Sequence, residues 1–234
     1  MIEANRKGNI ENNIHENISI GVNLSLIGGF LDAYSFILMG GVFANAQTGN
    51  LVLLFITCVN GEIEKILKYS IPIIMFALGI LLSEVLKYYW QNKNNSRVKF
   101  VLLFETIIII CIAITGKYVS ISIINCIISF LAAVQVSNFD KINGVPIATT
   151  MITGNLRSSM ININKYFFTK DNSYKDLFLT YLIVIISFGI GVSLGSIFAK
   201  FIGTYSILIC ITFLFTAYLC IIKEETKKLT TAST

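Results

Sequence analysis

One acidic side chain, Asp32, lies inside a long apolar stretch and is the first candidate for chemistry. No other charged residue occurs between Ile18 and Gly61. An acid within a membrane span costs about 2.5 kcal/mol or more to insert, and such residues by default mark functional sites. We therefore interpret Asp32 as a candidate proton carrier. The alternative is a structural acid that is hydrogen-bonded to irregular backbone nearby.

The tripeptide Thr-Gly-Asn occurs twice, at residues 48–50 and 153–155. Threonine and asparagine at a helix start can accept hydrogen bonds from its free N–H groups, and the helix dipole there favours anions. We predict that each tripeptide begins a short helix and that both helix starts face one cavity near the middle of the membrane. The alternative is that the motif only caps and packs its helix. The predicted binding residues are Asp32, Ser35, Asn45, Gln47, Thr48, Asn50, Gln135, Asn138, Thr149, Thr150, Thr153 and Asn155.

These candidates lie in apolar runs long enough to cross a bilayer. Hydrophobic residues make up 55% of the chain and charged residues 13%, with a mean hydropathy of +0.75, whereas soluble domains carry about 25% charged residues. A helix needs about 20 apolar residues to cross the hydrocarbon core. The sequence therefore predicts an all-α membrane protein with about six crossings, at residues 18–58, 69–90, 100–116, 118–140, 176–199 and 202–222.

The first and fourth of these units are too long for one straight helix. Gly40-Gly41 interrupts the first, and Asn143-Gly144-Val145-Pro146 follows the fourth. Glycine costs a helix about 1 kcal/mol and proline about 3 kcal/mol. We therefore expect both helices to be broken and followed by half-helices.

The distribution of lysine and arginine predicts the orientation, because cytoplasmic connections carry an excess of both. With both termini in the cytoplasm, the cytoplasmic segments contain thirteen of these cations and the opposite side four, and Lys141 falls within a span. The thirteen are Arg6, Lys7, Lys87, Lys93, Arg97, Lys99, Arg157, Lys165, Lys170, Lys175, Lys223, Lys227 and Lys228; the four are Lys65, Lys68, Lys117 and Lys200.

Two acids, Glu84 and Glu105, lie near the cytoplasmic ends of the second and third helices in this topology. The ordinary interpretation is that each pairs with a basic side chain close by in the sequence. The available partners are Lys87, Arg97 and Lys99.

The two tripeptides belong to a longer internal repeat. A Gly-Val pair precedes each of them, at 41–42 and 144–145, and the pattern Phe-x-x-Gly-x-x-x-small follows each, from Phe76 and from Phe188. Each copy contains three crossings, so the second copy enters the membrane from the other side, as in many secondary transporters. We therefore predict two inverted three-helix repeats, 18–116 and 118–222, between a polar arm, 1–17, and a charged tail, 223–234.

The same segments resemble the YoaK family of bacterial membrane proteins, from about residue 20 to 222. The resemblance implies an integral protein of the bacterial cytoplasmic membrane with about six helices, and it implies no activity. The segments that carry it are 29–36 (GFLDAYSF), 40–50 (GGVFANAQTGN), 132–138 (AAVQVSN) and 148–156 (ATTMITGNL).

Several function classes find no support in the sequence. It contains no phosphate-binding lysine loop and no HExxH, and most of its cations lie in connections between spans, so we expect neither an enzyme nor a nucleic-acid partner. His15 is the single histidine, and no cofactor or metal is expected. The leading hypothesis is a proton-coupled secondary transporter or permease for a small solute or ion, in contact with the lipid bilayer and compatible with a homo-oligomer. The alternative is a non-transporting scaffold or sensor.

Overall fold

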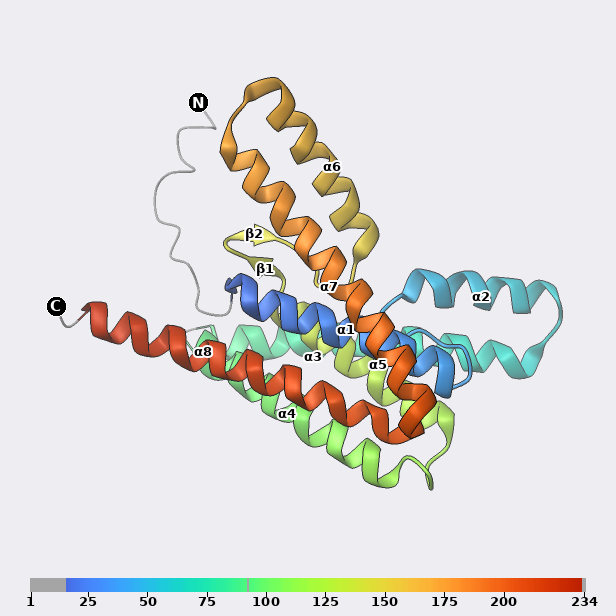
Figure 1. Ribbon diagram of the computed structural model, residues 1–234. Helices are drawn as coiled ribbons and strands as arrows, with labels where there is room; N and C mark the ends of the chain where they lie inside the picture. The colour runs from blue at the N-terminus through green and yellow to red at the C-terminus, as the bar shows by residue number, and fades with distance from the viewer. Residues whose placement is uncertain (1–15, 92, 233–234) are drawn as a thin grey trace.

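The computed structural model describes residues 16–91 and 93–232, and most of them are helical (Figure 1). The predicted arm over residues 1–17 falls almost wholly outside this range, and so do Arg6, Lys7 and His15. The last helix continues to Ala232, so the described part of the predicted charged tail is helical. The elements in chain order are α1 (Ile18–Leu38), α2 (Gln47–Val59), α3 (Ile63–Tyr89), α4 (Asn94–Thr115), α5 (Ile121–Asn138), β1 (Lys141–Ile142), β2 (Val145–Pro146), α6 (Ile152–Thr169), α7 (Asn172–Ile202), the 3-10 helix η3 (Gly203–Ile209) and α8 (Cys210–Ala232).

The chain leaves its first helix at a pair of glycines. Gly40 and Gly41 have φ angles of +84° and +78°, a region that residues with a Cβ rarely adopt. Helix α1 therefore ends at Leu38, and the short helix α2 begins at Gln47 after an irregular segment. The glycine pair thus separates two helices that the hydropathy pattern alone would join.

The second interruption is a small β-hairpin between α5 and α6. Strands β1 and β2 pair antiparallel, with Ile142 opposite Val145. The turn residues Asn143 and Gly144 have φ angles of 50° and 77°, and Asn-Gly is the pair that tight two-residue hairpin turns favour. Glu16 holds this turn against the start of α1, because its Oε2 accepts a 2.6 Å hydrogen bond from the Gly144 N–H.

Helices from the first half of the chain pack chiefly on helices from the second half. The largest contacts join α1 with α7 and α3 with α5, and Figure 1 shows α7 crossing over α1. Small residues permit this approach: a Cβ added to Gly79 of α3 would lie 2.7 Å from the Phe130 carbonyl oxygen of α5, and one added to Gly195 of α7 would lie 2.8 Å from the Phe30 carbonyl oxygen of α1. Close backbone contact through small residues is the usual packing of membrane helices.

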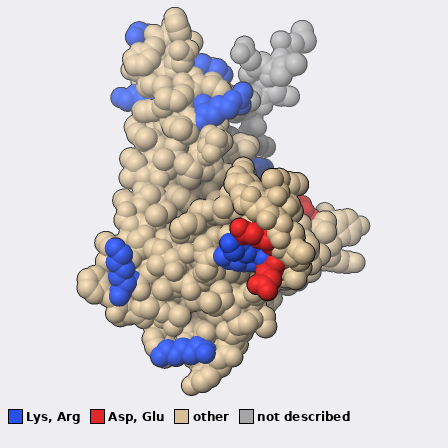
Figure 2. Space-filling model, turned by 90° about the vertical axis from the view of Figure 1, so that its right-hand side faces the viewer, with Lys and Arg blue, Asp and Glu red and all other residues tan. Residues whose placement is uncertain are grey.

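The outer surface is apolar over long stretches. Phe55, Leu81, Leu103 and Ile114 are each more than half exposed. On the face shown in Figure 2, charged side chains form a few small groups separated by broad uncharged surface. In the described part of the chain, five helical segments are long and apolar enough to cross a membrane: Ile18–Leu38, Ile63–Tyr89, Asn94–Thr115, Ile121–Asn138 and Asn172–Lys228. The chain is therefore an all-α, multi-pass membrane protein.

Three segments that are distant in the sequence meet at one end of the bundle. The Lys99 ammonium lies 2.9 Å from a Glu225 carboxylate oxygen, which joins the start of α4 to the end of α8. The Asn17 side-chain amide donates to the neighbouring Glu224 at 3.1 Å, which adds the start of α1. These contacts agree with a topology in which the three segments share one side of the membrane.

The expectation that Glu105 pairs with a nearby cation is wrong, whereas Glu84 does pair with Lys87 at 2.8 Å. The Glu105 side chain is 2% exposed, and its Oε1 has no hydrogen-bond partner among the described residues. The reason is its position on α4. It follows Leu102 by three residues and precedes Ile109 by four, and both of these face the core, so Glu105 points inward as well.

Candidate functional site

The two helix breaks meet at one cavity of about 640 Å³. Small-molecule sites have volumes of about 300–1,000 Å³, so this cavity has the size of one. Its lining comes from α1, the first break, α2, α3, the second break, α6 and α7, and consists of Asp32, Ala33, Phe36, Ile37, Phe43, Asn45, Ala46, Gln47, Thr48, Phe76, Thr150, Met151, Ile152, Thr153, Gly154, Phe188, Val192 and Ser196. In Figure 1 the starts of α2 and α6 lie toward the centre of the molecule.

Asp32 is fixed at the wall of this cavity by the first break. Its side chain is 6% exposed, and its Oδ1 accepts a 2.7 Å hydrogen bond from the backbone N–H of Asn45. The Asn45 side-chain amide donates in turn to the Gly28 carbonyl oxygen of α1 at 3.0 Å. The carboxylate therefore complements the positive end of α2, which begins two residues after Asn45.

The asparagines of the two Thr-Gly-Asn motifs do not line the cavity; they close the breaks. The Asn50 amide nitrogen donates to the Phe43 carbonyl oxygen at 2.7 Å, and its Oδ1 accepts from the Phe43 N–H at 2.9 Å. The Asn155 amide nitrogen donates to the Ala148 carbonyl oxygen at 2.7 Å. In both motifs the acceptor lies seven residues before the asparagine, so the two side chains have the same structural role.

Corresponding positions of the two motifs line the cavity together. Thr48 and Thr153 both line it, and so do the residues three positions before them, Asn45 and Thr150. The two glycines of the motifs differ. A Cβ added to Gly49 would lie 2.9 Å from the Phe43 ring, whereas one added to Gly154 would meet no atom within 4 Å.

The structure brings six of the twelve predicted residues to the cavity and buries the other six elsewhere. The six at the cavity are Asp32, Asn45, Gln47, Thr48, Thr150 and Thr153; the other six are Ser35, Asn50, Gln135, Asn138, Thr149 and Asn155.

Of the four others away from the cavity, three make side-chain hydrogen bonds within the bundle and one does not. Ser35 accepts a 3.1 Å hydrogen bond from the Ala44 N–H and so supports the first break. The Gln135 amide donates to the Leu24 carbonyl oxygen of α1 at 3.1 Å. Asn138 donates back to its own helix, and Thr149 is fully buried with no partner for its hydroxyl among the described residues.

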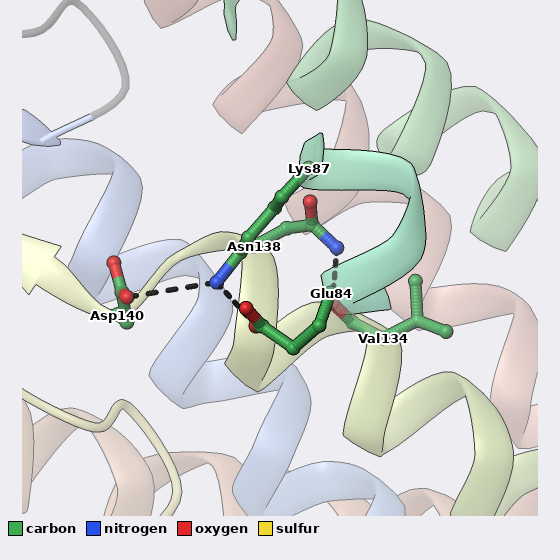
Figure 3. Close-up of polar contacts among 5 residues, drawn as sticks. All are labelled: Glu84, Lys87, Val134, Asn138 and Asp140. Carbon is green, nitrogen blue, oxygen red and sulfur yellow. Dashed lines mark hydrogen bonds and ion pairs between the residues drawn. The ribbon is translucent and has the colours of Figure 1, made fainter. Parts of the chain in front are cut away.

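Asn138 lies beside a charged cluster at the ends of α3 and α5 (Figure 3). Its amide nitrogen donates to the Val134 carbonyl oxygen at 2.9 Å. The adjacent Lys87 ammonium lies 2.8 Å from a Glu84 oxygen and 3.7 Å from an Asp140 oxygen. These charges do not line the cavity, and they connect α3 to the segment that follows α5.

The aromatic part of the cavity was missed by the sequence interpretation, which concentrated on polar residues. Phe36, Phe43, Phe76 and Phe188 all line it, together with Ser196. A signal was present for two of them, because Phe76 and Phe188 begin the two copies of the Phe-x-x-Gly-x-x-x-small pattern. Among the described residues, no group of three or more His, Cys, Asp or Glu side chains is arranged to hold a metal ion.

Comparison with known proteins gives a family match but no activity. The family model described as "Protein of unknown function (DUF1275)" matches residues 20–220. The UPF0700 transmembrane protein YoaK of Bacillus subtilis (strain 168) is 24% identical over 151 residues, which cover 63% of this chain and 67% of that protein. No solved structure matches the chain.

Proposed function

Because the chain belongs to the family DUF1275, whose function is unknown, we propose its function from its own residues: it is a secondary transporter or permease for a small solute, coupled to protons through Asp32. The observation that carries the proposal is the cavity. It lies where two broken helices meet, and helix breaks at a shared site are the recurrent binding arrangement of secondary transporters. Asp32 supplies an ionisable group within the wall of that cavity.

The proposal includes a membrane topology of six crossings in two inverted three-helix repeats, with both termini in the bacterial cytoplasm. The segment Asn172–Lys228 has 57 residues and contains a change of direction at η3, and about 20 residues suffice for one crossing. Two crossings there, with the other four segments, give six. The equivalent pairings of α1 with α7 and of α5 with α3 support an inverted repeat, as do the matching hydrogen bonds of Asn50 and Asn155.

Uptake by proteoliposomes tests this function. The purified chain is reconstituted, a pH gradient of either sign is imposed, and a panel of cationic, anionic and neutral small solutes is screened against empty liposomes. We expect protein-dependent accumulation of at least one solute, and we expect a protonophore to abolish it. If no solute accumulates under either gradient, the scaffold or sensor alternative replaces transport. If uptake persists after the gradient is collapsed, the protein is an uncoupled permease.

A further inference from the structure

The cavity wall contains a single kind of charge. Among the described residues that line it, Asp32 alone is charged; the other polar groups are the neutral side chains of Asn45, Gln47, Thr48, Thr150, Thr153 and Ser196. An anionic ligand would therefore meet a carboxylate without any basic side chain to pair with, and like charges at close range repel.

The helix dipole of α2 does not reverse this preference. The positive end of α2 is already complemented by Asp32, whose Oδ1 lies 2.7 Å from the Asn45 nitrogen. An anion bound there would compete with a carboxylate that the chain itself supplies. This geometry argues against the general expectation that helix starts attract anionic ligands.

The rest of the wall fits an aromatic or aliphatic cation. Four phenylalanines line the cavity, and two of them, Phe36 and Phe43, stack with their ring centroids 4.8 Å apart. The face of an aromatic ring attracts ammonium groups, and sites for quaternary ammonium ligands are commonly built from such rings. The volume of about 640 Å³ far exceeds the space that a bare metal ion or proton requires.

We propose that this cavity binds an organic cation, a molecule with an apolar body and one ammonium group that lies against the carboxylate of Asp32. The inference rests on the transport function proposed above and names its substrate class.

Three ligands that share a benzyl group separate the charge preference from the shape preference. They are benzyltrimethylammonium, phenylmethanesulfonate and benzyl alcohol, each titrated by calorimetry into the full chain in lipid nanodiscs, with empty nanodiscs as the blank. We expect the ammonium to bind at least about tenfold more tightly than the sulfonate or the alcohol, a difference of about 1.4 kcal/mol. Asp32→Asn should remove this preference by weakening only the binding of the ammonium.

A second variant keeps the test decisive if Asp32→Asn fails to fold. Gly154 lines the cavity, and a Cβ added there meets no atom within 4 Å, so Gly154→Val should fill the cavity and weaken ammonium binding without a clash. Gly189 provides the matched control, because a Cβ added to it also meets nothing within 4 Å while it lies outside the cavity lining. Gly189→Val should bind the ammonium as the wild type does.

The results distinguish a wrong ligand class from a wrong function. Sulfonate binding equal to that of the ammonium, or ammonium binding that Gly154→Val leaves unchanged, overturns the organic-cation site. If proteoliposomes accumulate an anionic or neutral solute and no ammonium binds, the transport function stands and the proposed substrate class is overturned. If the ammonium binds but no solute is taken up, the organic-cation site stands and the transport function is overturned.

Discussion

The carboxylate of Asp32 accepts a hydrogen bond from the backbone N–H of Asn45, thirteen residues later in the chain, at 2.7 Å. This bond joins an acid on α1 to the segment that leads into α2. It combines the two interpretations that the sequence left open, because Asp32 supports the broken backbone and also lines a cavity. The effects of a substitution at Asp32 should therefore be interpreted in terms of both roles.

If Asp32 carries the coupled proton, Asp32→Asn should still exchange solute, with weaker binding of a cationic one, while uptake loses its dependence on an imposed pH gradient. The reason is that an amide of the same shape cannot bind and release a proton. Uptake rates at several gradients, in proteoliposomes with equal protein content, measure this directly. Asp140→Asn is the matched control, because Asp140 is exposed and lies outside the cavity. Uptake by this variant should depend on the pH gradient as uptake by the wild type does. Unchanged coupling in Asp32→Asn would show that Asp32 is structural.

Cysteines placed at Thr48 and Thr153 should be joined by a short bismaleimide, because both residues line one cavity although 105 positions separate them. The five native cysteines are first replaced, and crosslinking is followed as a shift in gel mobility after a protease site is introduced between the two positions. The pair Thr48 and Thr169 is the control, since α6 carries Thr169 about 25 Å from its start. Equal crosslinking of both pairs would contradict a shared cavity.

Asn50→Ala should destabilise the protein more than Asn155→Ala. Asn50 exchanges two hydrogen bonds with the backbone of Phe43, whereas Asn155 makes one with Ala148. A buried backbone group that loses its partner costs about 1–3 kcal/mol, so we expect a loss of about 2 kcal/mol or more for Asn50→Ala. Thermal unfolding in detergent, monitored with a thiol-reactive dye, ranks the stabilities of the two variants. Equal stability of Asn50→Ala and the wild type would contradict the closing role of this side chain.

Reporter fusions test the proposed topology. A reporter placed after Lys93 or Lys170 should indicate the cytoplasm, and one placed near Gly61 or Lys117 the opposite side. The cation asymmetry predicts this pattern. The structure adds that Lys117 lies 4.7 Å from the ring centroid of Tyr205 in η3, so the turn after α4 and the turn before α8 share one end. Opposite signals at any two of the four sites would exclude the six-crossing arrangement.

Backbone features were predictable from sequence to a greater extent than side-chain directions. The glycine pair at 40–41 and the Asn-Gly pair at 143–144 have conformational preferences that act within a few residues, and both mark breaks in the structure. By contrast, the spacing of Asn50 cannot show that its amide turns back to Phe43 instead of toward the cavity. Glu105 was mispaired for a similar reason: sequence proximity to cations does not reveal which face of α4 it occupies.

The contact between α1 and α7 has a consequence for biosynthesis. Gly29 lies against the backbone of Phe188 and Val192, and Phe188 is translated 159 residues after Gly29 (188 minus 29). At about 5–20 residues per second, the ribosome needs roughly 8–30 s to make that length. During this time the cavity has no wall from α7, although α1 with Asp32 has already been synthesised. Until α7 has been made, α1 therefore lacks the helix against which it makes its largest contact.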